Sequence, residues 1–375
     1  MAKKVLLKDV ATLLNGRAYK QDELLDSGKY PVLRVGNFFS NRGWFYSDLE
    51  LEDDKYCDNG DLLFAWSASF GPKIWDGGKV IYHYHIWKII TTPQIDKKYF
   101  YYYLENAADR IKESGHGIAM IHTTKGEMEQ MELLLPEMEQ QLQIATVLDK
   151  VSELIALRKE QLAKLDRLVK SRFIELFGDP VRNPYRFPKV PLSELAEIKI
   201  GPFGSLLHKE DYITNGHALV NPSHIVAGKI SVDDELTVSD EKFSELSAYH
   251  LQIGDVVMGR RGEMGRCAVV QTDGLLCGTG SLLIRTKSDV TADYLQKIIS
   301  FPSFKKTIED MAVGQTMPNL NVPIVSRFQI IKPPIEVQKA YYTFVEQTDK
   351  SKLAIQQSLD KLELLKKALM QEYFE

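Results

Sequence analysis

The chain has 375 residues, of which 44% are hydrophobic and 26% are charged, and its formal net charge at pH 7 is −4. This length predicts two or three domains, and this composition excludes an intrinsically disordered chain. Because the net charge is slightly negative, any binding to nucleic acid would depend on local basic patches.

Cysteine usage and hydropathy indicate the compartment. The three cysteines form no C-x-x-C pair, which favours a reducing compartment and argues against disulfides or a zinc site. The N-terminal segment lacks the apolar run and the cleavage site of a secretion signal, and no apolar run approaches the roughly 18 residues that span a membrane. We therefore expect a cytoplasmic protein without a membrane segment.

Residues 1–136 are expected to form a mixed globular domain. Apolar or alternating runs predict strands at Asp61–Trp66, Lys79–Ile90 and Met131–Pro136, and the amphipathic run Lys97–Glu113 predicts a helix. Residues 179–334 are expected to form a second such domain, with strands in DVVMG, CAVVQ, LLIRT and RFQII and a helix at Ala292–Met311. The predicted fold class is α+β.

Residues 137–178 and 335–375 are predicted to form two long helices. No proline or glycine occurs between Pro136 and Gly178 or after Pro334. Apolar residues recur at alternating steps of four and three, which predicts a coiled coil rather than a core helix of an ordinary domain. The seam positions are Ile144, Leu148, Val151, Ile155, Arg158, Leu162, Leu165, Val169, Arg172 and Leu176, then Tyr341, Val345, Thr348, Lys352, Ile355, Leu359, Leu362, Lys366, Leu369 and Tyr373.

A long-period repeat links the two halves of the chain. Four pairs of segments match in the same order, at offsets that drift from about 185 to about 197 positions. The pairs are LKDVATLLNG with LSELAEIKIG, GDLLFAWSASFGP with GDVVMGRRGEMGR, IDKKYFYYYL with VTADYLQKII, and LLLPEMEQQ with IIKPPIEVQ. Duplication followed by loop insertions explains the drift, so the predicted order is domain, long helix, domain, long helix.

This order predicts a pseudo-twofold molecule that measures a distance. If the two long helices pack as an antiparallel coiled coil, they hold the two domains apart at a fixed separation. Duplex DNA presents equivalent faces at steps of about 34–36 Å, so two diverged domains would bind two different half-sites.

The turns LPEMEQQ and PPIEVQ before the two helices resemble the Pro-Pro-Leu-Glu-Glu-Gln signature of type I restriction–modification specificity subunits. The first departs by Glu137 at the second proline, and the second by Val337 at the second acidic residue. SRFIELFGDPVRNPYRF and VGQTMPNLNV are further marks, whereas SGHGIAMIHT is a weaker counterpart of the latter in the first domain. The resemblance covers essentially the whole chain and implies target-recognition domains at 1–136 and 179–334, with spacer helices at 137–178 and 335–375.

The resemblance implies a chain that does no chemistry itself. It would bind double-stranded DNA at a bipartite, asymmetric sequence and bring two adenine-N6 methyltransferase subunits and restriction–translocase subunits to it. S-adenosylmethionine, ATP and Mg would be bound by those partners, and this chain would hold no cofactor or metal. Two alternatives stay open: a coiled-coil scaffold whose domains bind protein ligands, and a nuclease or methyltransferase with a degenerate site.

The loop GRRGEMGR in the second domain fits neither common phosphate-binding glycine pattern. We interpret it as a turn that brings arginines to DNA, because arginine can pair bidentately with guanine or contact phosphate. The alternative is a solvated hairpin tip. The candidate DNA contacts of this domain are Ser205, Lys209, Asn221, Ser223, Arg260, Arg261, Arg266, Gln315, Thr316 and Asn319.

The corresponding loop of the first domain, AWSASFGPK, carries different side chains, as two domains that bind different half-sites require. The segment RVGNFFSNRGWF adds arginine and asparagine, which pair with guanine and adenine. The candidate DNA contacts of this domain are Arg34, Asn37, Asn41, Arg42, Trp66, Ser67, Ser69 and Lys73. A core position for Trp66 and simple turn chemistry at residues 41–43 are the alternatives.

No catalytic residues are predicted. Arg182–Tyr185, RNPY, is similar to the Asp/Asn-Pro-Pro-Tyr loop of N6-methyltransferases, but it has one proline too few and follows no glycine-rich cofactor loop. We interpret it as a linker, and no nucleophile or metal motif stands out elsewhere.

Overall fold

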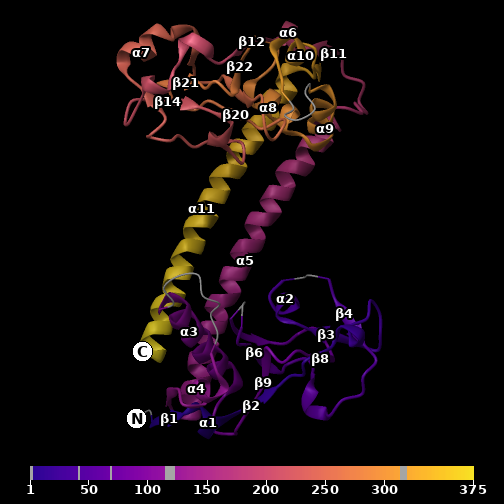
Figure 1. Ribbon diagram of the computed structural model, residues 1–375, viewed down its shortest axis with the longest axis vertical. Coiled ribbons are helices and arrows are strands. Elements are labelled where there is room, and N and C mark those ends of the chain that lie inside the picture. Colours follow the sequence, from indigo (N-terminus) through magenta and orange to yellow (C-terminus); the bar gives the residue numbers. More distant parts are fainter. Residues whose placement is uncertain (1–2, 41–42, 68–69, 115–122, 313–318) are drawn as a thin grey trace. The chain divides into compact units, whose positions relative to one another are not determined.

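The computed structural model describes residues 3–40, 43–67, 70–114, 123–312 and 319–375 (Figure 1). The chain divides into two compact units, Met1–Gln161 with Ile355–Glu375, and Leu162–Ala354. Each unit therefore combines one mixed α/β head with one stretch of each long helix.

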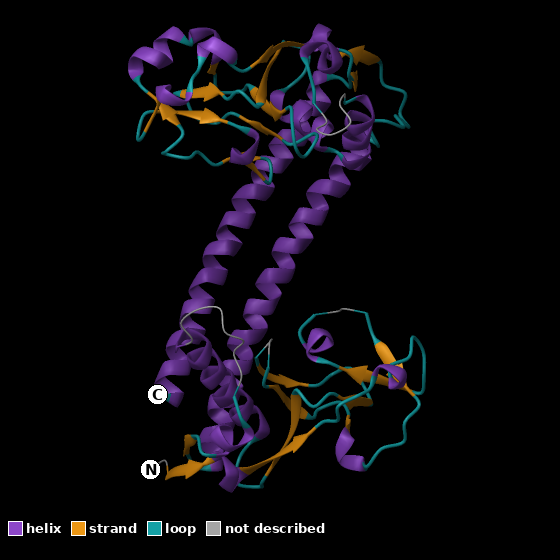
Figure 2. Ribbon diagram, in the orientation of Figure 1, coloured by secondary structure: helices purple, strands orange, loops and turns teal. Residues whose placement is uncertain are grey.

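The first unit is built on two four-stranded sheets (Figure 2). The antiparallel sheet has the order β2 (Ala11–Asn15), β9 (Ile86–Thr91), β6 (Leu62–Ala65), β7 (Gly71–Ile74). The second sheet has the order β4 (Phe45–Ser47), β3 (Tyr30–Leu33), β8 (Val80–Tyr82), β5 (Tyr56–Cys57), with β3 and β8 parallel. A separate antiparallel pair joins β1 (Lys3–Leu6) to β10 (Glu132–Leu135).

Helices pack on these sheets, most of them with the antiparallel sheet in one core, and α2 with the second sheet in another. They are α1 (Leu7–Val10), α2 (Val35–Phe38), α3 (Lys97–Ser114), α4 (Lys125–Glu129), and the long helices α5 (Met138–Phe177) and α11 (Ile335–Phe374). Tyr99 and Phe100 of α3 are fully buried in the same core as Ile144 of α5 and Phe374 of α11. Because full burial of each such side chain is worth about 1.5–3 kcal/mol, the start of α5 and the end of α11 are integral to this unit.

The second unit has the same kind of core. Its antiparallel sheet has the order β12 (Ala196–Ile200), β22 (Ser281–Thr286), β19 (Val256–Gly259), β20 (Cys267–Val269). Its other sheet has the order β13 (Tyr212–Ile213), β17 (Thr237–Val238), β14 (His217–Val220), β21 (Leu275–Cys277), β18 (His250–Leu251). Two further pairs are β11 (Lys189–Pro191) with β23 (Gln329–Ile331) and β15 (Ile225–Val226) with β16 (Lys229–Ile230). The helices of this head are α6 (Leu192–Leu195), α7 (Asp240–Glu245), α8 (Ala292–Ser300), α9 (Pro302–Met311) and α10 (Val322–Ser326).

The strand order β12-β22-β19-β20 repeats β2-β9-β6-β7, and this confirms the predicted duplication and the α+β class. Equivalent side chains also make equivalent hydrogen bonds. The Tyr99 hydroxyl donates to the Leu134 carbonyl at 2.7 Å, and the Tyr294 hydroxyl donates to the Ile331 carbonyl at 2.9 Å. The duplication therefore extends from the sequence pattern to individual polar contacts.

The repeated Gly-Asp pairs lie just before β6 and β19. Gly60 and Gly254 have φ values of 84° and 90°, a region that glycine adopts at little cost. The carboxylate of Asp61 lies 2.7 Å from the Lys88 ammonium, and that of Asp255 lies 2.7 Å from the Arg285 guanidinium. In each unit, the motif ties the turn to a neighbouring strand through an ion pair.

A buried glutamine fixes the start of each long helix. The Gln141 amide accepts from the Asp96 backbone N–H at 2.8 Å and donates to the Pro136 carbonyl at 2.8 Å. In the second copy, Gln338 accepts from the Thr291 N–H at 3.1 Å and donates to a proline carbonyl at 3.0 Å. The final Gln of the helix-start turns thus satisfies backbone groups that would otherwise be buried without partners.

The long helices α5 and α11 each run uninterrupted for 40 residues, as predicted. In the second unit, Tyr341 near the start of α11 donates to the Val169 carbonyl near the end of α5 at 3.4 Å. In the first unit, Lys159 of α5 pairs with Glu363 of α11 at 2.8 Å. The later residue of one helix meets the earlier residue of the other, so the predicted antiparallel packing is confirmed within each unit.

The charged residues on the seam have polar partners. Lys352 lies 2.7 Å from the Asp166 carboxylate, and Lys366 lies 2.8 Å from that of Glu105 in α3. Arg158 donates to the Gln161 side chain at 2.8 Å. These contacts let long cationic side chains occupy seam positions where an unpaired buried charge would be costly.

Two predicted elements are divided in the structure. The alternating run at residues 79–90 forms β8 and β9 in different sheets, because the His83 N–H donates to the Leu33 carbonyl and the His85 carbonyl accepts from Trp66, which turns the chain. The helix expected at Ala292–Met311 ends at Ser300 and restarts at Pro302. A residue before proline avoids the helical region, and Phe301 is accordingly extended, with ψ 136°.

We predict that Gln141→Ala lowers the free energy of unfolding by about 2–4 kcal/mol, because it leaves several buried backbone groups unpaired. The measurement is a urea titration of the purified chain. Gln140→Ala removes the exposed neighbour and is the matched control, with an expected change within about 0.5 kcal/mol. Equal effects of the two substitutions would contradict the role given to Gln141.

Candidate nucleic-acid interface

The segments that contain Gly259 and Gly280 pack against Pro222 in the second unit. A Cβ atom at Gly259 or at Gly280 would lie 3.1 or 2.9 Å from the Pro222 ring. Gly259 therefore lets the loop pack closely against this proline of the chain itself. Gly262, with φ 78° and open space around it, supplies the turn in the loop instead.

Next to Gly259, two arginines contact Asn319: they are Arg260 and Arg261. The Arg260 Nε donates to the Asn319 side-chain oxygen at 3.2 Å, and Arg261 pairs with Asn319 in an antiparallel bridge. Burial and the neighbouring charge of Arg261 lower the pKa of Arg260, but a guanidinium stays protonated at neutral pH. Arg261 itself is exposed, so the pair presents at least one accessible guanidinium to solvent.

Arg266 has a structural role that the sequence did not reveal. Its guanidinium lies 2.7 Å from the Glu263 carboxylate and donates to the Pro222 carbonyl at 3.1 Å. Lys305 lies 2.8 Å from the same carboxylate, and these cations, Lys305 first, lower the pKa of Glu263 to about 2. Arg266 therefore holds the loop to Pro222, and Glu263 links it to α9, while the predicted DNA contact of Arg266 stays a prediction.

The remaining described candidates of this unit are dispersed. Asn221 borders the cluster, where its side-chain oxygen lies 3.5 Å from the Gly280 N–H, and Ser223 is exposed beside it. Lys209 is exposed in the 3₁₀ turn Lys209–Asp211, and no contact between described residues joins it to Arg260 or Arg261. His224 is buried, and its Nδ1 lies 2.8 Å from the Leu219 carbonyl, which indicates a structural role.

In the first unit, Arg34 and Asn37 line a cavity of about 410 Å³ with Gly36, Phe45 and two histidines, His83 and His85. The Arg34 guanidinium lies 5.1 Å from the Phe45 ring centroid, and the Asn37 amide donates to the Gly43 carbonyl at 3.2 Å. Asn37 therefore also stabilises the turn that follows α2.

The loop after β6 holds Trp66 at the rim of the unit. The Trp66 indole N–H donates to the Tyr84 carbonyl at 2.8 Å, and its ring stacks on Trp87 with 5.8 Å between centroids. Ser67 is buried at 6% exposure. Lys73 lies 3.4 Å from the Asp76 carboxylate and 5.2 Å from the Trp75 ring centroid. Trp66 is thus half-buried, while Ser67 and Lys73 turn toward the protein.

Several predicted contacts lie outside the described residues. Their positions are Asn41, Arg42, Ser69, Gln315 and Thr316, together with the side chain of Ser205. The weaker resemblance segment before Thr123 lies outside them as well.

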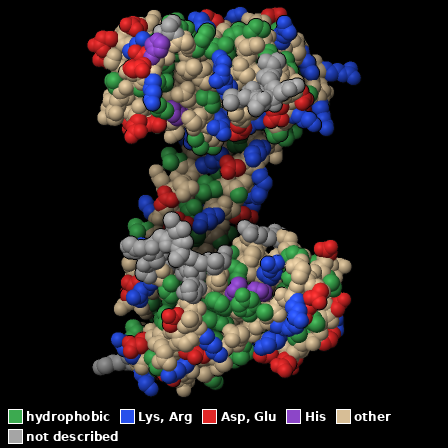
Figure 3. All heavy atoms as spheres, viewed as in Figure 1, with side chains coloured by type: hydrophobic (Ala, Val, Ile, Leu, Met, Phe, Trp, Pro, Cys, Tyr) green, Lys and Arg blue, Asp and Glu red, His purple; other side chains and the backbone are tan. Residues whose placement is uncertain are grey.

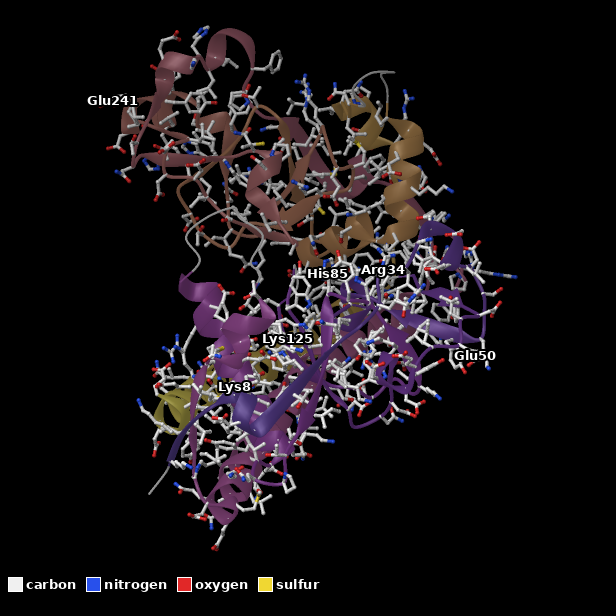
Figure 4. The ribbon with its side chains drawn as sticks, turned by 60° about the horizontal axis from the view of Figure 1, so that its bottom comes forward. Lys8, Arg34, Glu50, His85, Lys125 and Glu241 are labelled. Atoms are coloured by element: carbon white, nitrogen blue, oxygen red, sulfur yellow. The ribbon has the colours of Figure 1, made fainter. Side chains whose placement is uncertain are left out.

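The His83–His85 turn, which lies against Trp66, was not expected from the sequence. Ring centroids are 4.9 Å apart for Trp66 and His85, and 4.0 Å apart for Tyr84 and His85. Histidine side chains gather beside hydrophobic ones on this face of the first unit (Figure 3), and Arg34 lies near His85 (Figure 4). The only signal in the sequence was the alternation YHYH, which also fits a strand.

The pKa values of both histidines are lowered. Burial, followed by the nearby His85 and Arg34, lowers the pKa of His83 to about 4, and burial lowers that of His85. Both rings are therefore neutral at pH 7, and each neutral imidazole offers one hydrogen-bond donor and one acceptor.

The segment interpreted as a linker is a fixed turn. Asn183, with φ 49°, accepts from the Phe187 N–H at 2.9 Å and donates to the Phe187 carbonyl at 2.7 Å. Among the described residues, no group of three or more His, Cys, Asp or Glu is placed to hold a metal ion. In the same part of the chain, no helix is both long and apolar enough to cross a membrane.

A family model for the type I restriction modification DNA specificity domain matches residues 2–167 and, a second time, residues 186–365. The chain belongs to this family. Both halves of this specificity chain carry the match, so the resemblance first seen in the helix-start turns is confirmed.

Relatives of the specificity chain are similarly distant in sequence. It is 22% identical over 330 residues to the MjaVIII specificity subunit of Methanocaldococcus jannaschii, covering 84% of this chain and 78% of the relative. It is 18% identical over 295 residues to the EcoBI specificity subunit of Escherichia coli, covering 72% and 62%. The chain therefore spans less than two thirds of the EcoBI subunit.

Solved structures share the fold of the specificity chain. The S subunit of a type I restriction–modification system from M. genitalium matches with a TM-score of 0.60 and 14% identity, covering 100% of this chain and 96% of that one. A chain from a study of assembly and conformational transition of the type I R-M system matches with a TM-score of 0.61 and 15% identity, covering 99% and 97%.

The Glu263 contacts predict a pH dependence of stability in the second unit. Because the folded pKa lies near 2 and the ordinary value is 4.5, the contribution is fully present above about pH 4.5 and is lost as pH falls toward 2. We expect the difference in Tm between the wild type and Glu263→Gln to be constant from pH 7 to 5 and to shrink below that. Thermal scans across this range measure it, with Glu210→Gln as the control at an exposed glutamate. A difference that is unchanged at pH 3 would refute this account.

Proposed function

We propose that this chain is the specificity subunit of a type I restriction–modification complex and that each unit binds one half of a bipartite, asymmetric DNA sequence. The pair of matched loops carries this proposal. Trp66 and Arg260 hold the same backbone position, because their N–H groups donate to the His85 and Gly280 carbonyls at 3.1 and 3.0 Å. One position therefore presents an indole in the first unit and a guanidinium in the second. Base edges are distinguished by such differences between side chains.

The proposed target-recognition domains are residues 1–136 and 179–334, with spacer helices at 137–178 and 335–375. In the second domain, the arginine pair beside Asn319 supports DNA contact, since Arg261 is exposed. The family match in both halves supports a DNA-binding role for each domain over a scaffold for protein ligands.

The proposed partners are two adenine-N6 methyltransferase subunits and further restriction–translocase subunits. Large apolar side chains stay exposed on both long helices away from the seam: Leu154, Leu157 and Leu168 on α5, and Leu353, Leu364 and Leu365 on α11. Where such side chains form a contiguous patch, they mark a protein–protein contact site, and this is the reason for placing the docking surface on the helices.

The proposed division of labour leaves chemistry to those partners. S-adenosylmethionine would be bound by the methyltransferase subunits, and ATP and Mg²⁺ by the restriction–translocase subunits. The relatives of this chain are themselves specificity subunits, which supports a role in recognition and not in catalysis.

Mapping adenine-N6 methylation in cells that carry this chain and its methyltransferase subunit tests the proposed function. We expect one abundant split motif, with modified adenines on opposite strands. Replacing residues 190–330 with the corresponding domain of another specificity subunit should change only one half of the motif. Methylation without any split motif would overturn the proposal.

Arg261→Ala is expected to weaken binding of the assembled methyltransferase complex to its duplex target. Loss of one base or phosphate contact is worth about 1–3 kcal/mol, or about 5- to 150-fold in Kd. Fluorescence anisotropy at fixed salt measures the change. Arg182→Ala removes an exposed arginine from the turn at residues 182–185 of the same unit and is expected to leave the Kd unchanged. A Kd that Arg261→Ala does not alter would remove this residue from the interface.

A further inference from the structure

The turn between β8 and β9 has the same backbone frame as the turn between β21 and β22. The His83 N–H donates to the Leu33 carbonyl at 2.9 Å, and the Gly278 N–H donates to the Val220 carbonyl at 3.0 Å. Each turn closes in the same way, since the Ile86 and Ser281 N–H groups donate to the carbonyls of residues 83 and 278. The two turns are therefore equivalent positions of the duplicated fold.

A glycine that follows the first strand of each antiparallel sheet packs directly against each turn. A Cβ atom on Gly16 would lie 2.5 Å from the His83 carbonyl oxygen, and one on Gly201 would lie 2.1 Å from that of Gly278. Such distances are too short for any side chain. The backbone that follows β2 therefore approaches the first turn as closely as the backbone that follows β12 approaches the second. The frame is thus fixed by backbone on both sides.

The side chains on this frame are entirely different. The first unit carries His83, Tyr84 and His85, where the second carries Gly-Thr-Gly at 278–280. In the second unit, a Cβ at Gly278 would lie 2.3 Å from the Asn221 side-chain oxygen, so the turn is closed over by its neighbour. In the first unit, both histidines instead line the open cavity beside Arg34.

The three rings form one cluster with Trp66. His83 lies 4.4 Å from Tyr84 and 4.8 Å from His85 between ring centroids, and Trp66 lies 6.1 Å from Tyr84. Tyr84 is 39% exposed, and the Trp66 N–H is already used by the Tyr84 carbonyl. Tyr84 is therefore the exposed ring of this cluster, and both histidines are half-buried beside it.

We propose that His83, Tyr84 and His85, supported by Trp66, form the surface with which the first unit reads base edges of duplex DNA in its half-site. This inference rests on the proposed function and names the residues that give the first unit its own specificity. The second unit uses Arg260 and Arg261 beside the equivalent, glycine-closed turn.

The chemistry of the cluster suits bases and not phosphates. Both imidazoles are neutral at pH 7, so they carry no charge to attract a phosphate. The backbone N–H of His85 points to Nδ1 of His83 at 3.5 Å, which favours a proton on Nε2 of that ring. A donor at Nε2 matches the acceptors that purines expose in the major groove, and the Tyr84 ring offers apolar contact to a thymine methyl.

The matched frame supplies a variant that the fold already accepts. His83→Gly, Tyr84→Thr and His85→Gly together install the residues that the same backbone carries in the second unit. We expect one half of the methylation motif to lose discrimination at one or more base pairs by about 5- to 150-fold, while the other half is unchanged. Ile90→Thr, at an exposed position of β9, is the control and should keep the wild-type motif.

Salt titration of DNA binding provides the second measurement. Loss of base contacts leaves the slope of log K against log salt unchanged, whereas loss of a phosphate contact reduces it by about 1. An unchanged motif in the triple variant, or a slope reduced by about 1, overturns the inference.

If the triple variant gives no methylation, the methylation motif of the single variant Tyr84→Thr is mapped instead. The motif and the salt slope of that variant then test the inference. A wild-type complex without a split motif refutes the proposed function instead, so the two failures are distinguishable.

Discussion

The fold depends on the way the ends of the long helices are buried in the cores of the two units. In the first unit, Ile144 of α5 and Phe374 of α11 share one core with the α3 aromatics. In the second, Phe177 of α5 and Tyr341 of α11 do the same. The polar part of each junction is a single glutamine amide, Gln141 or Gln338. A helix that is part of a core cannot change its direction without unpacking that core, so each head and its stretch of paired helix fold as one body.

The two copies of the fold share their backbone frame but differ in many of the side chains that it carries. The hydrogen bonds made by Tyr99 and Gln141 recur at Tyr294 and Gln338, so the positions that hold each unit together have stayed equivalent. The turn at residues 83–85 and its counterpart at 278–280 share a backbone but no side chain. A frame fixed by main-chain hydrogen bonds tolerates such exchange, because few of its contacts depend on residue type.

The sequence predicted the features whose physics is local or periodic. A heptad seam on α5 and α11, the glutamine of each helix-start turn and the repeated Gly-Asp pair all have sequence signals of their own. It did not predict the break between β8 and β9, since alternation fits a strand and an exposed turn equally well. Nor did it show that Glu263 pairs with both Arg266 and Lys305, because Lys305 in α9 is distant from Glu263 in sequence.

Recurrence of the same junction has a genetic consequence. Tyr99 and Leu134, or Tyr294 and Ile331, lie within one copy of the repeat, as do Asp96 and Gln141. Because Gln141 and Gln338 pair with backbone groups, which any head with the same frame supplies, a crossover in the coding sequence at the start of a long helix would replace a whole head and keep these hydrogen bonds. Exchange of this kind gives the encoded protein a new combination of binding surfaces in one step, with the joint to the helix left intact.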